Sequence, residues 1–172
     1  MKSSVNKVLL GSATVLALGA AGQVAQAATT GVLIQAIVLS PVDISQTQSL
    51  NFGSLTESGA GGTITVDNTG TPATSPGVTS IGGTIQAGGF KLLGSIGKAV
   101  KVTAAAKATL TNGGGGTMTV NAFTIEGAAG TFVHTMVAAT DSGFRLGGTL
   151  NVGAGQATGT YNGSVVLTAI YQ

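Results

Sequence analysis

The stretch GTYNGSVVLTAIY, residues 159–171, places an apolar or small residue at every second position. Successive side chains of a β-strand point to opposite faces of the sheet, so this period of two predicts a long strand with one buried face. We expect it to be the last strand of a sheet that packs on a second sheet. The side chains expected on the buried face belong to Gly159, Tyr161, Gly163, Val165, Leu167, Ala169 and Tyr171.

The same period of two recurs upstream, between clusters of glycine, asparagine, aspartate and serine such as 58–62, 112–116 and 153–155. Short strands with a turn signal every roughly 8 to 12 residues are typical of a β-sandwich. The sequence therefore predicts an all-β fold, an antiparallel β-sandwich of immunoglobulin-like or pilin-like type. The candidate strands are residues 32–39, 42–45, 49–55, 62–68, 89–93, 99–104, 108–111, 117–125, 132–137, 144–152 and 159–171.

Residues 97–116 allow two local predictions of secondary structure. The alanines in 97–111 would tolerate a helix, but Val100 to Thr103 alternates, so we predict a strand followed by an extended or hairpin segment. Asn112-Gly113 is a strong hairpin signal. Because four consecutive glycines begin at Gly113, we expect a longer, mobile loop instead of a two-residue turn.

The first 27 residues have the features of an export signal. Lys2 and Lys7 precede an apolar run at 8–22, and small residues stand at Ala25 and Ala27. A transmembrane anchor would need about 20 apolar residues, and this run is shorter and diluted by glycine, serine and threonine. We therefore expect a signal peptide (1–27), an N-terminal strand that is a candidate donor strand (28–40) and a β-sandwich domain (41–172).

Composition excludes several classes of partner. Without residues 1–27 the chain carries five basic and five acidic residues, so its net charge is near zero. The loose basic cluster from Lys91 to Lys107 has only Phe90 as an aromatic neighbour, which argues against nucleic acid. No polybasic run suits a membrane surface, so we expect membrane contact only during export. The chain has no cysteine, so strand pairing and apolar burial must stabilise the exported domain.

No set of residues has the spacing of a catalytic or metal site. The single histidine, His134, lies in a predicted strand with no carboxylate within six residues, and the carboxylates stand singly. Folding could still bring two carboxylates together, which keeps a hydrolase as the third and least favoured function. We expect no enzymatic activity, no catalytic residue, no metal site and no cofactor.

The segment from Thr30 to Leu39 is more apolar than a free N-terminus should be. It forms either the first strand of its own domain or a strand that completes the sheet of a neighbour, by β-augmentation. Both arrangements remain open at the level of sequence. Pro41 lacks an amide donor and disfavours helix at Ser40, so it is a candidate hinge. The candidate strand-exchange residues, which share one face, are Val32, Ile34, Ala36 and Val38.

Several short stretches of the sequence resemble those of one bacterial family. They are Leu50-Asn51-Phe52-Gly53, Gly62 to Val66, Ala87 to Phe90, Met118 to Phe123 and, most specifically, Gly147 to Gly163. On these stretches the chain is similar to the DUF4402 family of exported proteins, over nearly all of the exported part. The resemblance implies an all-β exported domain and says little about activity.

A looser similarity is to subunits of chaperone-usher pili. Those subunits end in an alternating apolar strand with a penultimate tyrosine and a glycine fourteen positions from the end, where this chain has Tyr171 and Gly159. They also begin with an alternating apolar donor segment. The chain departs from them in lacking the disulfide that many carry.

These features together predict an exported structural or adhesive cell-surface protein, a pilin-like subunit that assembles by strand exchange. Its expected partners are copies of itself or related subunits and a periplasmic chaperone, and its expected location is the periplasm, the cell surface or the medium. The alternative is a monomeric secreted module that binds carbohydrate or another ligand. The small number of aromatic residues argues against sugar stacking.

Cleavage after Ala27 gives the first testable outcome. Mass spectrometry of the exported protein should find Ala28 as the first residue, because small residues stand at both positions that the peptidase reads. An intact Met1 on exported protein would contradict the prediction.

Overall fold

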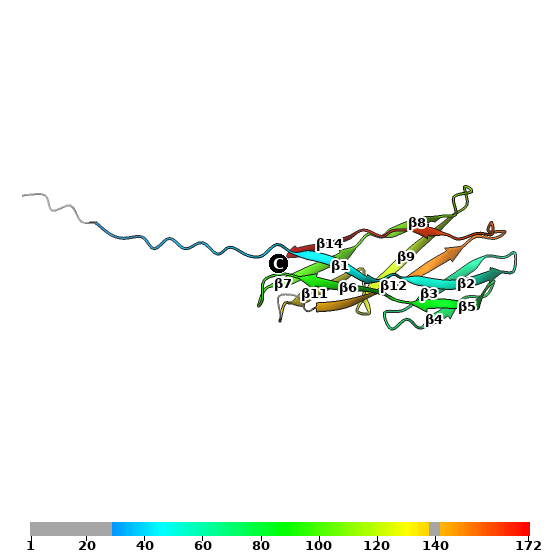
Figure 1. Cartoon of the computed structure of the whole chain (residues 1–172), viewed down its shortest axis with the longest axis horizontal. Coiled ribbons are helices and arrows are strands. Elements are labelled where there is room, and N and C mark those ends of the chain that lie inside the picture. Colours follow the sequence, from blue (N-terminus) through cyan, green and yellow to red (C-terminus); the bar gives the residue numbers. More distant parts are fainter. Residues whose placement is uncertain (1–28, 138–141) are drawn as a thin grey trace, which may run out of the picture. The chain divides into compact units, whose positions relative to one another are not determined.

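The computed structural model describes residues 29–137 and 142–172, and these contain strands and no helix, hence none that could span a membrane. The all-β prediction is confirmed (Figure 1). Residues 1–27, where the export signal is predicted, lie outside the described residues. The strands are β1 (Asp43–Gln48), β2 (Asn51–Glu57), β3 (Gly62–Val66), β4 (Pro72–Thr74), β5 (Val78–Gln86), β6 (Gly88–Leu93), β7 (Ala99–Ala104), β8 (Lys107–Thr111), β9 (Thr117–Ile125), β10 (Ala128–Ala129), β11 (Thr131–Thr135), β12 (Ser142–Val152), β13 (Asn162–Gly163) and β14 (Leu167–Tyr171).

All strand pairs are antiparallel, as the short connections require. The largest sheet follows the order β1-β6-β12-β9-β8-β13, with β3, β4 and β10 attached beside this path. A second sheet has the order β11-β7-β14, and β2 pairs with β5. The sheets form a sandwich around one apolar core.

The core is built from side chains that alternate inward along the central strands. Phe144, Leu92, Ile64 and Ile125 are completely or almost completely buried. The Phe144 ring stacks on Phe90, with 5.2 Å between ring centroids and 14° between ring planes. Offset aromatic packing of this kind adds to the burial of apolar area, which replaces disulfides as the source of stability.

The predicted strands at 99–104 and 117–125 have the expected bounds, and 97–111 forms strands and no helix. The Asn112 turn is a five-residue loop, because Thr111 pairs with Thr117. Asn112 closes it by accepting hydrogen bonds from the amides of Gly114 and Gly116 at 3.0 and 2.9 Å.

Residues 32–39 form no strand in the single chain. Two expectations about strands within the β-sandwich domain were wrong. The strand β5 was missed because Gly82-Gly83 looks like a turn, whereas both glycines adopt left-handed φ values of 109° and 81° inside the strand. Residues 159–171 form two short strands instead of one. Leu167 faces Ala104 in β7, and Gly163 faces Leu110 in β8. The segment between Ala104 and Leu110 is longer than the segment between Gly163 and Leu167, so the pairing is interrupted there.

The β-sandwich domain has two distinct ends. Residues Ser40 and Tyr171 lie at one end, where the C-terminus is drawn in Figure 1. We call the opposite end, formed by the turns at 58–61, 112–116 and 153–159, the loop end. The first strands β1 and β2 run toward the loop end, and β13 and β14 run back from it.

The alternation of β14 can be tested with two neighbouring substitutions. Leu167 packs against the core, whereas Thr168 is exposed on the other face. Leu167→Asp should lower the free energy of unfolding by about 2–4 kcal/mol, because a charge would replace an apolar contact. Thr168→Asp is the matched control and should change it by less than about 0.5 kcal/mol. Urea unfolding followed by circular dichroism measures both, and equal effects would show that β14 has no inward face.

Candidate functional site

The first and the last strands of the sandwich each have one unpaired edge. Among the described residues, β1 pairs only with β6 and β2 only with β5, while β13 pairs only with β8 and β14 only with β7. No described strand lies between these two pairs of strands. Unpaired edges expose backbone N–H and C=O groups that can pair with another strand.

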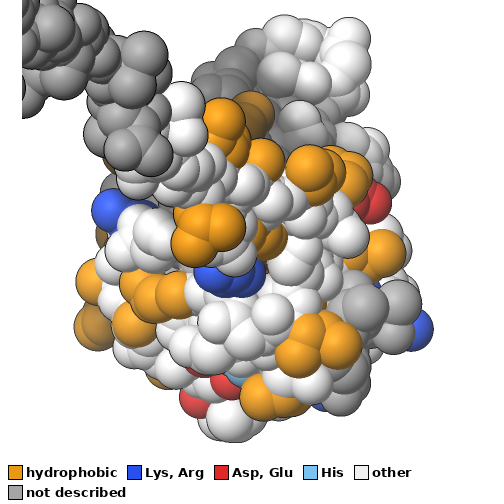
Figure 2. Space-filling model, turned by 90° about the vertical axis from the view of Figure 1, so that its left-hand side faces the viewer, with side chains coloured by type: hydrophobic (Ala, Val, Ile, Leu, Met, Phe, Trp, Pro, Cys, Tyr) orange, Lys and Arg blue, Asp and Glu red, His pale blue; other side chains and the backbone are white. Residues whose placement is uncertain are grey.

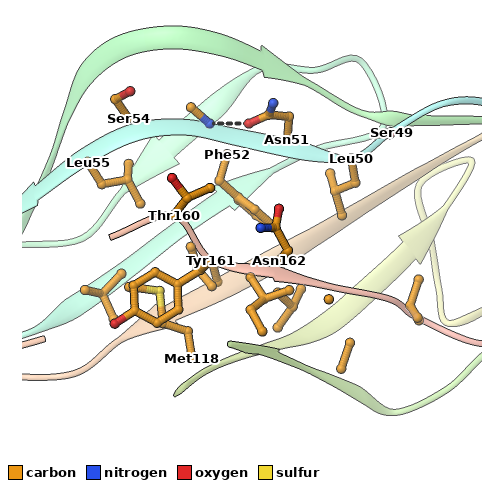
Figure 3. Close-up of a pocket in the computed structure, with 18 of the residues that line it drawn as sticks. Ser49, Leu50, Asn51, Phe52, Ser54, Leu55, Met118, Thr160, Tyr161 and Asn162 are labelled. Carbon is orange, nitrogen blue, oxygen red and sulfur yellow. Dashed lines mark hydrogen bonds between the residues drawn. The ribbon is translucent and has the colours of Figure 1, made fainter. Parts of the chain in front are cut away.

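A groove of about 940 Å³ opens between these edges (Figure 3). One wall, the β2 wall, consists of Gln46 and residues 49–57, and the other, the C-terminal wall, of residues 156–165. Leu50 and Phe52 point from the β2 wall toward the C-terminal wall. The remaining lining belongs to the core and is apolar: Phe90, Ala108, Leu110, Met118, Val120, Phe123, Leu146, Leu150 and Val152. The apolar core of the sandwich therefore forms the floor of the groove.

Four residues of the series predicted for the inner face of the C-terminal strand contact the core, whereas Gly163 is exposed. Val165, Leu167, Ala169 and Tyr171 are half-buried, and the residues between them are exposed. Leu50 and Leu55 in the β2 wall are half-buried in the same way. Inward side chains on both walls therefore lack the cover that a strand between them would provide.

Three hydrogen bonds close the end of the domain at which the N-terminal segment is attached. The Tyr171 hydroxyl donates to the carbonyl of Ser40 at 2.7 Å and accepts from the amide of Ser95 at 2.6 Å. The amide of Ser40 donates to Ser95 Oγ at 2.8 Å. We call Ser40, Ser95 and Tyr171 the clasp, and their end of the domain the clasp end.

The groove does not extend to the clasp. Val42 and Ile44 of the first strand and Leu167 and Ala169 of the last strand pack against the core, and none of them lines the groove. At the other end the lining includes Glu57 and residues 156–159, which belong to the loop end. The groove is therefore closed toward the clasp and reaches the loop end.

Tyr161 holds the C-terminal wall in place near the loop end. Its hydroxyl accepts from Gln156 Nε2 at 2.7 Å and from Asn112 Nδ2 at 3.3 Å, and donates to the carbonyl of Ala157 at 2.7 Å. Gly163 follows in the same wall, where a Cβ atom would lie only 2.3 Å from the carbonyl oxygen of Thr109. A glycine is therefore required for β13 to approach β8. Gly159, the first residue of the predicted series, is exposed and has a left-handed φ of 143°.

The candidate strand-exchange residues are exposed in the single chain. Val32, Ile34 and Val38 have exposed fractions of 78%, 93% and 94%, and Ala36 is exposed too. None of them belongs to a strand. The groove and this apolar segment are thus both uncovered in one copy of the protein.

Three of the described carboxylates accept hydrogen bonds that hold local structure. Glu57 accepts a hydrogen bond from the amide of Gly59 at 2.6 Å, and Glu126 accepts one from the amide of Arg145. The Thr69 hydroxyl and the Thr71 amide lower the pKa of Asp67, so its turn loses stability as the pH falls and the carboxylate is protonated. No group of three metal-binding side chains occurs within the described ranges. The His134 ring stacks on Phe132 with 5.8 Å between centroids.

Sequence reasoning missed the groove, the clasp and the Tyr161 network. Ser95 lies in a Gly-Ser-Ile-Gly turn that carries no signature of a partner 76 residues away. The one available signal was Asn112 before a glycine run, since asparagine commonly accepts hydrogen bonds from the backbone of its own turn.

Removal of one hydroxyl tests the Tyr161 network. Tyr161→Phe should lower the free energy of unfolding by about 1–3 kcal/mol, because Gln156, Asn112 and Ala157 would lose a shared partner. Thr160→Ala, at an exposed neighbouring position, should leave stability nearly unchanged. Thermal unfolding measures both variants, and an unchanged melting temperature in Tyr161→Phe would show that the network contributes nothing.

Comparison with known proteins identifies the family. The family model described as a domain of unknown function, DUF4402, matches residues 42–171. Searches of curated proteins and of solved structures gave no match. The matched range begins at the first residue after Pro41 and ends at Tyr171 of the clasp, so it covers both walls and all the core residues of the groove. The chain belongs to the DUF4402 family.

Proposed function

We propose that this protein is an exported structural or adhesive subunit of the bacterial cell surface, which assembles when its N-terminal segment enters the groove of another copy. The observation that carries the proposal is the groove itself, which has an unpaired strand edge on each side and core residues as its floor. An extended apolar segment would pair with those edges and cover the floor. The same chain supplies such a segment at Val32 to Val38.

The segment and the groove match in length. The range Val32 to Val38 contains seven residues, and the groove-lining stretch from Gly159 to Val165 also contains seven. At about 3.3 Å per residue both span roughly 23 Å. Four alternating side chains, Val32, Ile34, Ala36 and Val38, would then face the core along the whole wall.

The N-terminal segment and the groove would each cover what the other exposes. In a single copy, β-branched side chains such as Ile34 are almost fully exposed, and two strand edges have no partner among the described residues. Exposed edges and apolar strands promote uncontrolled aggregation, so proteins normally cover them. Strand exchange between copies removes both liabilities. A periplasmic chaperone that occupies the groove before assembly would serve the same purpose, and related subunits are alternative donors.

A ligand-binding module is the second candidate function. A volume of about 940 Å³ lies within the range of small-molecule sites, and Thr160 and Asn162 bring polar groups to the C-terminal wall. Sugars usually stack on exposed aromatic rings, however, and every aromatic ring in the described part of the chain is buried or half-buried. Absence of glycan binding by a tail-deleted protein that still binds its own N-terminal peptide would favour assembly over this alternative.

Deletion of the segment tests the proposal directly. The processed protein should form oligomers by size-exclusion chromatography with light scattering, whereas a protein without residues 28–39 should be monomeric. A synthetic peptide of residues 30–39 should bind the shortened protein and raise its melting temperature, because it refills the groove. A shortened protein that is as oligomeric as the parent would rule out the proposal.

A pair of substitutions in the full chain separates assembly from folding. Ile34→Asp puts a charge on the face predicted to enter the groove, at a side chain that is 93% exposed in the single copy. It should abolish oligomers while the melting temperature of the monomer stays unchanged. Gln35→Asp, one residue along and on the other face, is the matched control and should still assemble.

A further inference from the structure

The groove has one closed end and one open end, and this asymmetry restricts how a strand can enter it. Toward the clasp, Val42 and Ile44 meet the core beside Leu167 and Ala169, and the clasp joins the two walls beyond them. Toward the loop end, the lining continues to Glu57 and Thr158. A donor strand remains covalently attached to its own domain at Ser40, so the attached end must leave through the open end.

We infer that the donor segment of a second copy enters with Thr30 toward the clasp and Leu39 at the loop end, so that copies assemble head to tail. This inference rests on the proposed function and specifies its direction. The donor would run antiparallel to the C-terminal strand, which runs from the loop end toward the clasp. Processing after Ala27 would leave only Ala28 and Thr29 ahead of Thr30, which suits a closed end.

The two walls favour the same direction. Antiparallel pairing is slightly more stable per residue than parallel pairing, so the more regular edge should determine the direction. The C-terminal wall has no residue with a left-handed φ after Gly159. The β2 wall is interrupted by Gly53, with a φ of 75°, and the pairing of β1 shifts between Gln46 and Gln48. The C-terminal wall, although only Asn162–Gly163 of it is in a strand, therefore has no left-handed interruption from Thr160 to Val165, and pairing with it is antiparallel in the inferred direction.

The length of the segment excludes insertion into its own copy. The N-terminal segment leaves its domain at the clasp end, whereas the groove opens at the loop end. The first strands, from Asp43 to Glu57, separate these ends by 15 residues, or roughly 50 Å, and the ten residues 30–39 span only about 33 Å. The segment therefore cannot reach the open end of its own groove. In the inferred head-to-tail arrangement each copy gives a segment to one neighbour and receives one from another, which is heterologous and open-ended, and a reciprocal antiparallel pair is the alternative that crosslinking distinguishes.

The surface of the clasp end suits such a contact. Ile96 and Val137, which are 64% and 70% exposed, lie in two turns joined by a 2.7 Å hydrogen bond from the amide of Gly97 to the carbonyl of Met136. Figure 2 views the molecule from this side and shows separate apolar side chains over the surface, with few charged ones. Head-to-tail assembly would place this surface against the loop end of the next copy and cover part of it.

The absence of cysteine from the chain allows a direct test with engineered cysteines. Proteins that each carry one cysteine are mixed, so every crosslink formed by a short thiol-reactive linker joins two copies. Gly31→Cys with Ser164→Cys should crosslink at the closed end, and Ile37→Cys with Thr158→Cys at the open end. The swapped mixtures, Gly31→Cys with Thr158→Cys and Ile37→Cys with Ser164→Cys, are the matched controls. They should react at least tenfold less, because six residues, or roughly 20 Å, separate the two sites on each strand.

A protein with both Gly31→Cys and Ser164→Cys tests the symmetry. On a non-reducing gel it should give a ladder of covalent oligomers, whereas a closed reciprocal pair would stop at the dimer. Preferential crosslinking of the swapped mixtures would overturn the inferred direction, and a dimer alone would overturn head-to-tail assembly. Both outcomes would leave strand exchange standing. A processed protein that stays monomeric and crosslinks in no mixture would overturn the proposed function itself. Oligomers that form without any of these crosslinks would show that the groove is not the interface.

Discussion

The structure depends on the groove between the first and the last strands of the sandwich, whose edges have no partner strand among the described residues. Backbone groups at a strand edge need a partner or water, and inward side chains need a covering layer. Here β2 and β13 each have a described partner on one side only. The groove between them explains why inward residues such as Leu50 and Val165 are half-buried, while Leu92 and Val100 on inner strands are fully buried.

The clasp gives this open sandwich a defined boundary. One hydroxyl, on Tyr171, binds both Ser40 and Ser95, and so joins the start and the end of the domain. In a chain without cysteine, hydrogen bonds of this kind do part of what a disulfide does in domains that contain one, although each contributes far less. Because both backbone groups of Ser40 are engaged, the point at which the N-terminal segment begins is fixed.

Small residues allow neighbouring strands of the domain to approach closely. Gly163 lets β13 approach Thr109 in β8, and Gly147 packs against the backbone of Val66, where a Cβ atom would lie 2.6 Å from the carbonyl oxygen. Bulky or charged residues would separate these strands. The low content of charged and aromatic residues is therefore a property of close sheet packing, and it also leaves few groups that could perform chemistry.

The sequence by itself determined the strand class, the inward face of residues 159–171 and most strand positions, because side-chain alternation and turn chemistry are local properties. It also marked Val32 to Val38 as an apolar segment in need of cover. Tertiary structure alone decided that β5 continues through Gly82-Gly83, that the last strand divides in two and that Tyr171 binds Ser40. Those features depend on which distant strand lies alongside, and no local pattern encodes a contact between residues 131 positions apart. The groove belongs to the same class, because its two walls come from distant parts of the sequence, residues 46–57 and 156–165.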